Sequence, residues 1–390
     1  MASVTTSTDQ PVPPILSLVA ITAFGLIGPF VFLVSPVIAG QLALEWHWSP
    51  GDIGLLMSVE LGGAALVSFP AAFLLRRFSW RPLTVVASLV FVGAAVGSGV
   101  VARAGGDATW LIPLRFIGGA GGGALSVVCL LAAGRSADPH RAFACWTGGQ
   151  TVSAALGLLY LPRLFEHVGL AGLYALLAVA ALLALTMVTG LPAGWPDASG
   201  VQHGGGGQHG SGSTAARLNF LAIFCYYLAI SGAWAFVGVP GLALGLTEEG
   251  VGTLTAVAMF TAILGSVLAT LSGHARRRDA YTVGVFGLLL ACLVALAFPT
   301  GRGGFIAAVV LLQVCWSFLV PMLLAALADA DDGGGLVILS NMIIGGGAAL
   351  GPLLAGYALD YAGTYVAVAA QGAVLLALSA AAFIAARRRF

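Results

Sequence analysis

Two charged side chains stand inside otherwise apolar segments of this chain, where an ionised group is costly. Glu60 lies eight residues beyond Asp52, about 12 Å along a helix, and Arg115 lies about 9 Å into a second segment from the same side. Burial favours the protonated carboxyl and a nearby guanidinium favours the carboxylate, so changing surroundings can make Glu60 take up and release a proton. We predict Glu60 as a proton site that Arg115 tunes, unless Arg115 holds an anion. The alternative is a static ion pair that fixes helix packing.

Aromatic and amide side chains in the apolar segments are candidates for a binding cavity. Tyr227, Ser231 and Trp234 follow one another at i, i+4 and i+7, which places them on one face of a helix. The other candidates, each with an amide or indole edge, are Trp146, Gln150, Gln313, Trp316 and Asn341. Any of them can instead join two helices by a hydrogen bond. If these residues contact the substrate, they predict a small amphipathic or aromatic solute. An anionic solute would bind Arg115, and a cationic solute would compete with the proton at Glu60.

The elements that must position these residues are membrane helices. Apolar residues make up 59% of the 390 residues and charged residues only 8%. About 20 apolar residues cross the ~30 Å hydrocarbon layer. The sequence predicts twelve such helices, at about 14–44, 51–75, 82–102, 109–134, 142–165, 169–190, 218–243, 250–272, 280–299, 304–328, 336–359 and 363–386. A polytopic membrane protein follows, and a net charge of +1 gives no indication of a nucleic-acid partner.

The arginines predict the orientation of the chain. Every basic residue is arginine, and all but four of the 16 fall on the side that holds both termini. The positive-inside rule therefore predicts cytoplasmic N- and C-termini. The composition, rich in arginine, alanine and glycine and free of lysine, favours a bacterial cytoplasmic (inner) membrane.

The chain divides into two halves. We predict a cytoplasmic tail at 1–13, a six-helix bundle at 14–190, a cytoplasmic Gly/Ser-rich linker at 191–217, a second six-helix bundle at 218–386 and a cytoplasmic tail at 387–390. Residues 49–56 are echoed by 247–254, and residues 154–157 by 348–351, which indicates a repeat in the same direction. Such repeats are typical of secondary transporters, in which one half rocks against the other.

The sequence resembles the major facilitator superfamily over essentially its whole length. The resemblance is carried by Leu111, Arg115, Gly119, Gly121 and Gly123, which match that family's helix 4 signature. The signature between helices 2 and 3 is eroded, with Arg76 in place of the acid, and Leu158 stands where an antiporter signature has proline. The resemblance implies an all-α membrane protein of twelve helices in two pseudo-symmetric six-helix bundles, with a central cavity lined by helices 1, 4, 7 and 10.

Charged residues at the ends of the helices are candidates for gates. The predicted cytoplasmic gate pairs basic residues after helix 2 with acids after helix 10, and its members are Arg76, Arg77, Arg81, Asp329, Asp331 and Asp332. These acids also precede helix 11, whose dipole favours negative charge, so they can serve that helix alone. A periplasmic counterpart is predicted between Arg163 and Glu248 or Glu249.

Together these patterns predict a proton-coupled secondary active transporter that works by alternating access as a monomer. A facilitative uniporter or exchanger is the alternative, and a channel, an intramembrane enzyme or a sensor that does not transport are others. No cofactor is implied. His203 and His209 belong to a flexible linker rather than a metal site, and the five cysteines are interpreted as small buried residues.

Overall fold

The computed structural model of the chain describes residues 14–136, 138–192, 214–273, 277–329 and 336–389. The regular structure in these ranges is helical. In chain order the elements are α1 (Pro14–Gly25), α2 (Ile27–Leu33), α3 (Ser35–Trp46), α4 (Pro50–Arg77), α5 (Trp80–Arg103), α6 (Ala108–Gly134), α7 (Pro139–Leu185), a 3-10 turn (Val188–Gly190), α8 (Thr214–Ala235), α9 (Gly238–Ala243), α10 (Glu248–Gly273), α11 (Arg278–Ala297), α12 (Arg302–Ala328), α13 (Leu336–Ala362) and α14 (Tyr365–Arg387).

Twelve membrane spans emerge from these helices. Ten helices are long and apolar enough to cross a bilayer, and the bent pair α1 and α2 makes eleven. α7 has 47 residues, which is about 70 Å of helix and more than twice the hydrocarbon thickness. It is interrupted at Gly169, whose φ of 59° is a left-handed conformation that glycine adopts without steric cost. α7 therefore supplies two spans, and the predicted twelve-helix fold is confirmed.

The first and seventh spans are broken, which the sequence analysis did not anticipate. The first is made of α1, α2 and α3, with a bend of 42° between α1 and α2. Pro29, Pro36 and Pro240 lie in the first turns of α2, α3 and α9. Proline has no N–H to donate to the preceding turn, so it is tolerated where a helix begins and breaks one that would continue.

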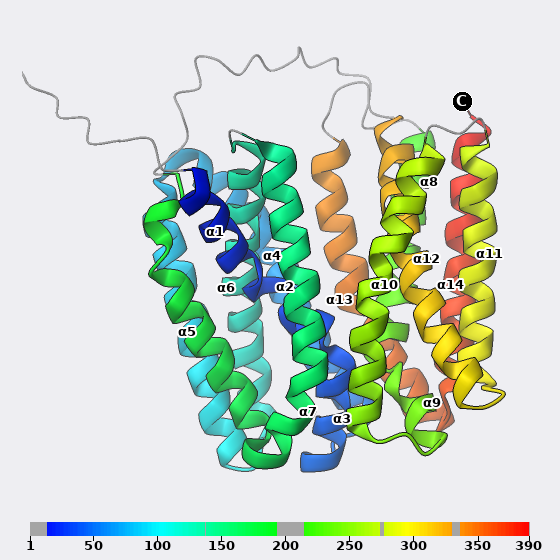
Figure 1. Ribbon diagram of the computed structural model, residues 1–390, viewed down its shortest axis with the longest axis horizontal. Helices are drawn as coiled ribbons and strands as arrows, with labels where there is room; N and C mark the ends of the chain where they lie inside the picture. Colours follow the sequence, from blue (N-terminus) through cyan, green and yellow to red (C-terminus); the bar gives the residue numbers. More distant parts are fainter. Residues whose placement is uncertain (1–13, 137, 193–213, 274–276, 330–335, 390) are drawn as a thin grey trace, which may run out of the picture.

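The helices pack as two groups that touch along two seams. In the first half α4, α5 and α6 pack together and α7 packs against α1 and α5; in the second half α8 packs against α13 and α14, and α12 against α10 and α11. Across the halves α4 packs against α13 and α7 against α10. Figure 1 shows the first half, blue to green, beside the second. We call the end where α4 and α10 begin the outer end, and the end where α14 finishes the inner end.

Candidate functional site

Glu60 of α4 and Arg115 of α6 form a buried bidentate ion pair. Nη2 of Arg115 donates to Oε1 of Glu60, and Nε donates to Oε2 at 3.1 Å. Arg115 is 1% exposed and Glu60 is 8% exposed. Paired N–H···O bonds between a guanidinium and a carboxylate are stronger than bonds between neutral groups. Each charge therefore compensates the other in surroundings that would penalise either alone.

Glycine brings the two helices close enough for this contact. The backbone of Gly119, one turn beyond Arg115, lies against the Glu60 carbonyl group, and a Cβ atom at Gly119 would overlap that oxygen. Small residues permit such close approach between membrane helices. The glycines of the helix 4 signature thus help to set the separation at which the carboxylate reaches the guanidinium.

Two further side chains hold the Arg115 guanidinium. Its central carbon lies 5.2 Å from the centroid of the Tyr174 ring, within the range of a cation–π contact. Nη1 lies 3.5 Å from the Ser98 hydroxyl. Tyr174 is on α7 and Ser98 on α5, so Arg115 is fixed from several helices of the first half. Glu60, in contrast, is carried by the helix that packs against α13 of the second half.

Three aromatic rings meet where the halves touch near the middle of the chain's spans. The Trp316 ring lies edge-on to Trp234 at 6.1 Å and to Phe32 at 6.0 Å between centroids. The Trp234 indole is fully buried and its Nε1 donates to the Leu33 carbonyl of α2 at 3.2 Å. Two predicted binding residues, Trp234 and Trp316, are therefore brought together. In this conformation the Trp234 N–H is occupied by the other half.

Trp146 and Gln150 share a second location, against the end of α1. Gln150 Nε2 donates to the Gly25 carbonyl at 3.1 Å. The Trp146 indole also lies against Gly25, and its ring centroid is 6.2 Å from that of Phe143. Its buried Nε1 has no hydrogen-bond partner within the part of the chain that the structure describes. This N–H can therefore donate a hydrogen bond to a further acceptor.

The remaining predicted binding residues lie on three helices of the second half, α8, α12 and α13. Gln313 is buried and its Nε2 lies 3.2 Å from Sδ of Met259 on α10. Ser231 approaches the Gly347 carbonyl of α13 at 3.5 Å, and the Tyr227 ring packs on Tyr226 at 5.4 Å. Asn341 lies on α13, and its side chain is outside the described residues. Among the described side chains, no hydrogen bond or ring contact joins Gln313, Ser231 or Tyr227 to Trp146 or Gln150.

An exposed ion pair links the halves at the outer end. Arg163 of α7 donates to Oε1 of Glu249 of α10 from Nε at 2.9 Å and from Nη2 at 2.6 Å. The two side chains are 57% and 45% exposed, and exposed pairs contribute about 0–1 kcal/mol. The Glu248 carboxylate instead lies against Gly40 of α3. Of the two predicted partners, Arg163 takes Glu249.

A hydrogen bond that the sequence did not predict also links the halves at the outer end. The Gly51 N–H, in the first turn of α4, donates to Oδ2 of Asp360 near the end of α13 at 2.8 Å. About two turns further along α4, the Leu353 N–H donates to the Ser58 hydroxyl at 2.9 Å. Asp360 therefore supplies a negative charge to the N-terminus of a helix in the other half. The internal repeat, which makes Glu166 and Asp360 equivalent, singles out Asp360 in the sequence, but it does not show that the Gly51 N–H is its partner.

Comparison with known proteins shows a sequence likeness in the first half of the chain and a likeness of fold over nearly all of it. The sequence model of the Major Facilitator Superfamily matches residues 16–205, and solved structures of its fold match nearly the whole chain. The first half of the chain is therefore similar in sequence to the Major Facilitator Superfamily, and nearly the whole chain has the fold of that superfamily's transporters. Proteins of this family and fold are transporters and not enzymes. A comparison of the sequence with curated proteins gave no match.

Three solved structures of transporters illustrate the likeness of fold. A bacterial homologue of the human lysosomal transporter Spinster, inward-facing and occupied, is 16% identical with a TM-score of 0.74, and the match covers 98% of each chain. A D-xylose–proton symporter is 15% identical with a TM-score of 0.72 over 94% of this chain and 97% of its own. The transporter FucP in its outward conformation is 18% identical with a TM-score of 0.62 over 97% of this chain and 99% of its own.

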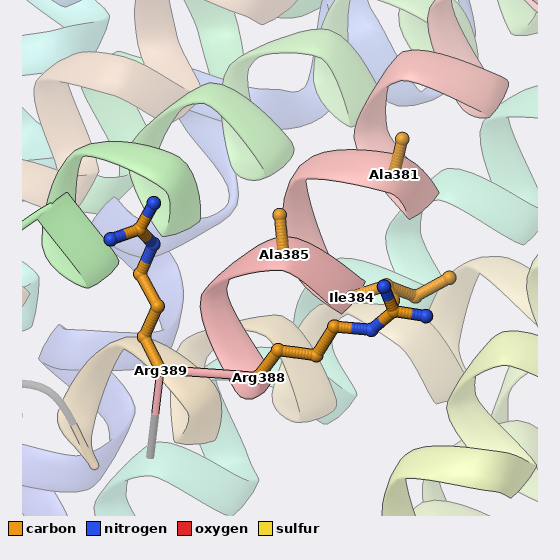
Figure 2. A pocket seen from close by; sticks show the side chains of 5 residues that line it. All are labelled: Ala381, Ile384, Ala385, Arg388 and Arg389. Atoms are coloured by element: carbon orange, nitrogen blue, oxygen red, sulfur yellow. The ribbon is translucent and has the colours of Figure 1, made fainter.

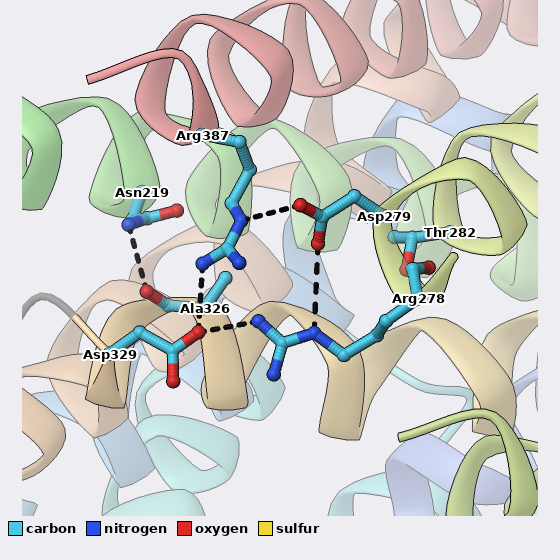
Figure 3. A network of polar contacts seen from close by, with 7 residues as sticks. All are labelled: Asn219, Arg278, Asp279, Thr282, Ala326, Asp329 and Arg387. Atoms are coloured by element: carbon cyan, nitrogen blue, oxygen red, sulfur yellow. Dashed lines mark hydrogen bonds and ion pairs between the residues drawn. The ribbon is translucent and has the colours of Figure 1, made fainter. Parts of the chain in front are cut away.

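The inner end of the protein holds a charged network that differs from the predicted gate (Figure 3). Asp329 pairs with Arg278 of α11 and with Arg387 of α14, the latter at 2.7 Å. Arg387 also donates to Asp279 at 2.9 Å. Asp329 was expected to face the arginines after α4, but the ends of α11 and α14 lie nearer in the packed second half and supply its two guanidinium partners.

The other members of the predicted cytoplasmic gate serve different neighbours or fall outside the description. Arg81 donates to the carbonyls of Leu191 at 2.9 Å and Thr189 at 3.0 Å, which ties α5 to the end of the first half. Arg77 is exposed at the end of α4. Asp331, Asp332 and the Arg76 side chain lie outside the described residues, as does most of the predicted linker.

The Asp329 network predicts loss of stability in acid. Burial opposes ionisation of Asp329, but hydrogen bonds from Arg278 and Arg387 outweigh it and lower the pKa of this carboxyl. A carboxyl whose pKa is lower in the folded state stabilises the fold above its unfolded pKa of about 4, and that stability is lost as pH falls through the folded pKa. The side chain is 40% exposed, so we expect a contribution below about 1 kcal/mol at pH 7.

Thermal unfolding of the purified protein in detergent, measured from pH 7 to pH 3, checks this expectation. Asp329→Asn should unfold at a lower temperature than the wild type at pH 7 and should lose less stability on acidification. Glu166→Gln, which changes an exposed carboxylate outside the network, serves as the control. Identical pH profiles for Asp329→Asn and the wild type would contradict the assignment.

Proposed function

We propose that this protein is a proton-coupled secondary active transporter that moves a small amphipathic or aromatic solute by alternating access. The observation that carries the proposal is the Glu60–Arg115 pair, an acid held within a membrane span beside a fixed cation. Ionisable groups inside membrane helices commonly mark ion or proton pathways. The name of one structural relative, a D-xylose–proton symporter, is consistent with such coupling in this fold.

The geometry suggests how the proton would be exchanged. Arg115 is fixed by Tyr174 and Ser98, whereas Glu60 rides on α4 at the seam with α13. Movement of α4 would separate the carboxylate from the guanidinium and leave both buried charges uncompensated. Protonation of Glu60 removes the penalty on the carboxyl group, while Ser98 and Tyr174 stay beside the Arg115 guanidinium. Proton uptake would therefore accompany the conformational change of the seam.

The solute class follows from aromatic and amide groups inside the spans. The buried Trp146 indole N–H lacks a partner within the described residues, and it would reach an acceptor atom on the solute once the contact with α1 opens. Gln150 beside it and the Trp316 ring add an amide and an aromatic face. We propose the predicted set of Trp146, Gln150, Tyr227, Ser231, Trp234, Gln313, Trp316 and Asn341 as binding residues, with the Trp234 N–H released when the halves separate.

The two predicted bundles, 14–190 and 218–386, joined by the linker at 191–217, would rock against each other, and α4 would shift against α6 within the first bundle. We propose that both termini and the inner end face the cytoplasm, that the membrane is the bacterial inner membrane and that the monomer is the functional unit. Bonds from Arg163 to Glu249 and from Gly51 to Asp360 would close the periplasmic side. An inward-facing state is supported by the higher TM-score to the inward-facing Spinster homologue than to outward FucP.

A wild-type transport screen tests the function. Purified protein in proteoliposomes would be given an imposed pH gradient and aromatic acids, neutral aromatics or lipophilic cations. We expect one class to accumulate against its gradient and accumulation to collapse when a protonophore is added. Equal ratios of internal to external solute with and without the pH gradient would favour a facilitative uniporter or exchanger. The Glu60–Arg115 ion pair would then only fix helix packing. Binding without flux would favour a sensor.

Removal of Asp360 tests the outer gate. Asp360→Ala deletes the acceptor for the α4 N-terminus and should shift the protein toward opening at the outer end by about 1 kcal/mol, or about fivefold in the ratio of conformers. Spin labels at Ala104 and Tyr361, exposed outer-end positions in opposite halves, would report a larger population of long distances. The native cysteines would first be replaced.

The repeat provides a matched control for this experiment. Glu166→Gln alters the residue equivalent to Asp360 in the first half, at the same end of the molecule, and should leave the distance distribution unchanged. An unchanged distribution in Asp360→Ala would show that this carboxylate does not hold the outer end closed.

A further inference from the structure

We infer that the inner end of α14 carries a binding site for an anionic phospholipid. A hollow of about 620 Å³ lies there, lined by Ala381, Ile384, Ala385, Arg388 and Arg389 (Figure 2). The inference depends on the membrane-spanning fold and not on proton coupling, so it can fail or succeed independently of the proposed transport activity.

The hollow lies on the face of α14 that is turned away from the protein. Val374 and Leu378 are 62% and 51% exposed, and with Ala381, Ala385 and Arg388 they follow at spacings of three and four residues, which places them on one face of the helix. The opposite face is buried. The short side chains of Ala381 and Ala385 leave the depression between the larger Leu378 and Arg388. An acyl chain can lie along this apolar stripe.

Charge at the rim complements a phosphate group. Arg387 turns inward and bonds to Asp279 and Asp329. Arg388 and Arg389 are exposed, and among the described residues no carboxylate lies within ion-pair distance of either. Figure 2 shows their side chains reaching to opposite sides of Ala385. Guanidinium groups form strong charge-assisted hydrogen bonds with phosphate, and here two flank the top of an apolar stripe.

An anionic phospholipid is the occupant that uses both parts of the site. A soluble anion would need the arginines but not the apolar floor. A second copy of the chain in a symmetric contact would bring two further arginines against these two. A lipid places its phosphate at the helix end and its acyl chain beside Ala381 and Ala385. Basic pockets at this depth are a known means of binding anionic head groups.

Native mass spectrometry of the full-length protein in detergent tests the site. Dioleoyl phosphatidylglycerol would be titrated against dioleoyl phosphatidylcholine as the neutral lipid. We expect preferential binding of phosphatidylglycerol, weakened about 25-fold in R388Q/R389Q, which is about fivefold for each arginine at about 1 kcal/mol. A385F keeps the charges but fills the hollow, and should weaken binding about tenfold through lost acyl contacts.

The control removes a comparable charge elsewhere. Arg141 is exposed at the inner end of α7 in the first half, and R141Q should change phosphatidylglycerol binding less than twofold, against about fivefold for R388Q. Unchanged binding in R388Q/R389Q, or an equal loss in R141Q, would overturn the site. So would equal competition by glycerol 1-phosphate, which would indicate a free-anion site, or a dimer that A385F disrupts, which would indicate a second copy.

Discussion

Replacing Glu60 with glutamine is expected to abolish solute accumulation driven by a pH gradient while counterflow exchange continues. One proton moving down a gradient of one pH unit releases about 1.4 kcal/mol, enough for about tenfold accumulation of a neutral solute. Glutamine keeps the size of the side chain and an acceptor for Arg115, but it cannot carry the proton. The accumulation ratio in proteoliposomes should therefore fall to about one.

Counterflow is the internal control of this experiment, because exchange of labelled for unlabelled solute shows that the variant is folded and binds substrate. Glu166→Gln, an exposed carboxylate at the outer end, should accumulate solute as the wild type does. Normal accumulation by Glu60→Gln would remove Glu60 from the coupling mechanism and leave the pair with a structural role.

Depth in the membrane was predictable from the sequence because a helix advances by a fixed rise for each residue. That rise placed Glu60 and Arg115 at similar depth, and the structure brings them into contact. The glycines that allow the contact were visible as part of the helix 4 signature. Apolar length similarly gave the twelve spans, apart from their breaks.

Neighbours across the bundle were not predictable in the same way, because they depend on how helices rotate and pack. Asp329 takes partners from α11 and α14, which are distant in sequence. The Gly51–Asp360 bond depends on an ordinary backbone N–H that no sequence pattern distinguishes. The kink at Gly169 was also not predicted. The lengths of the apolar segments separate helices five and six, but they do not show that a single left-handed residue joins the two helices.

Replacement of Arg115 alone should cost far more stability than replacement of an exposed arginine. Arg115→Gln leaves the Glu60 carboxylate buried without a cation, and removal of one partner of a buried pair costs about 3–5 kcal/mol. Arg163→Gln, which breaks the exposed pair with Glu249, should cost about 0–1 kcal/mol. Reversible unfolding in mixtures of dodecyl sulfate and a mild detergent would measure both free energies. Similar costs for the two variants would show that the Arg115 pair is not effectively buried.

The double variant Glu60→Gln/Arg115→Gln separates the two interpretations of the pair. Removing both charges eliminates the uncompensated ion, and replacement of a whole buried pair is often close to neutral. Stability should therefore return to within about 1–2 kcal/mol of the wild type. If the pair only fixed helix packing, gradient-driven accumulation would return with stability. We expect stability to return without accumulation, because the restored fold still lacks the group that carries the proton.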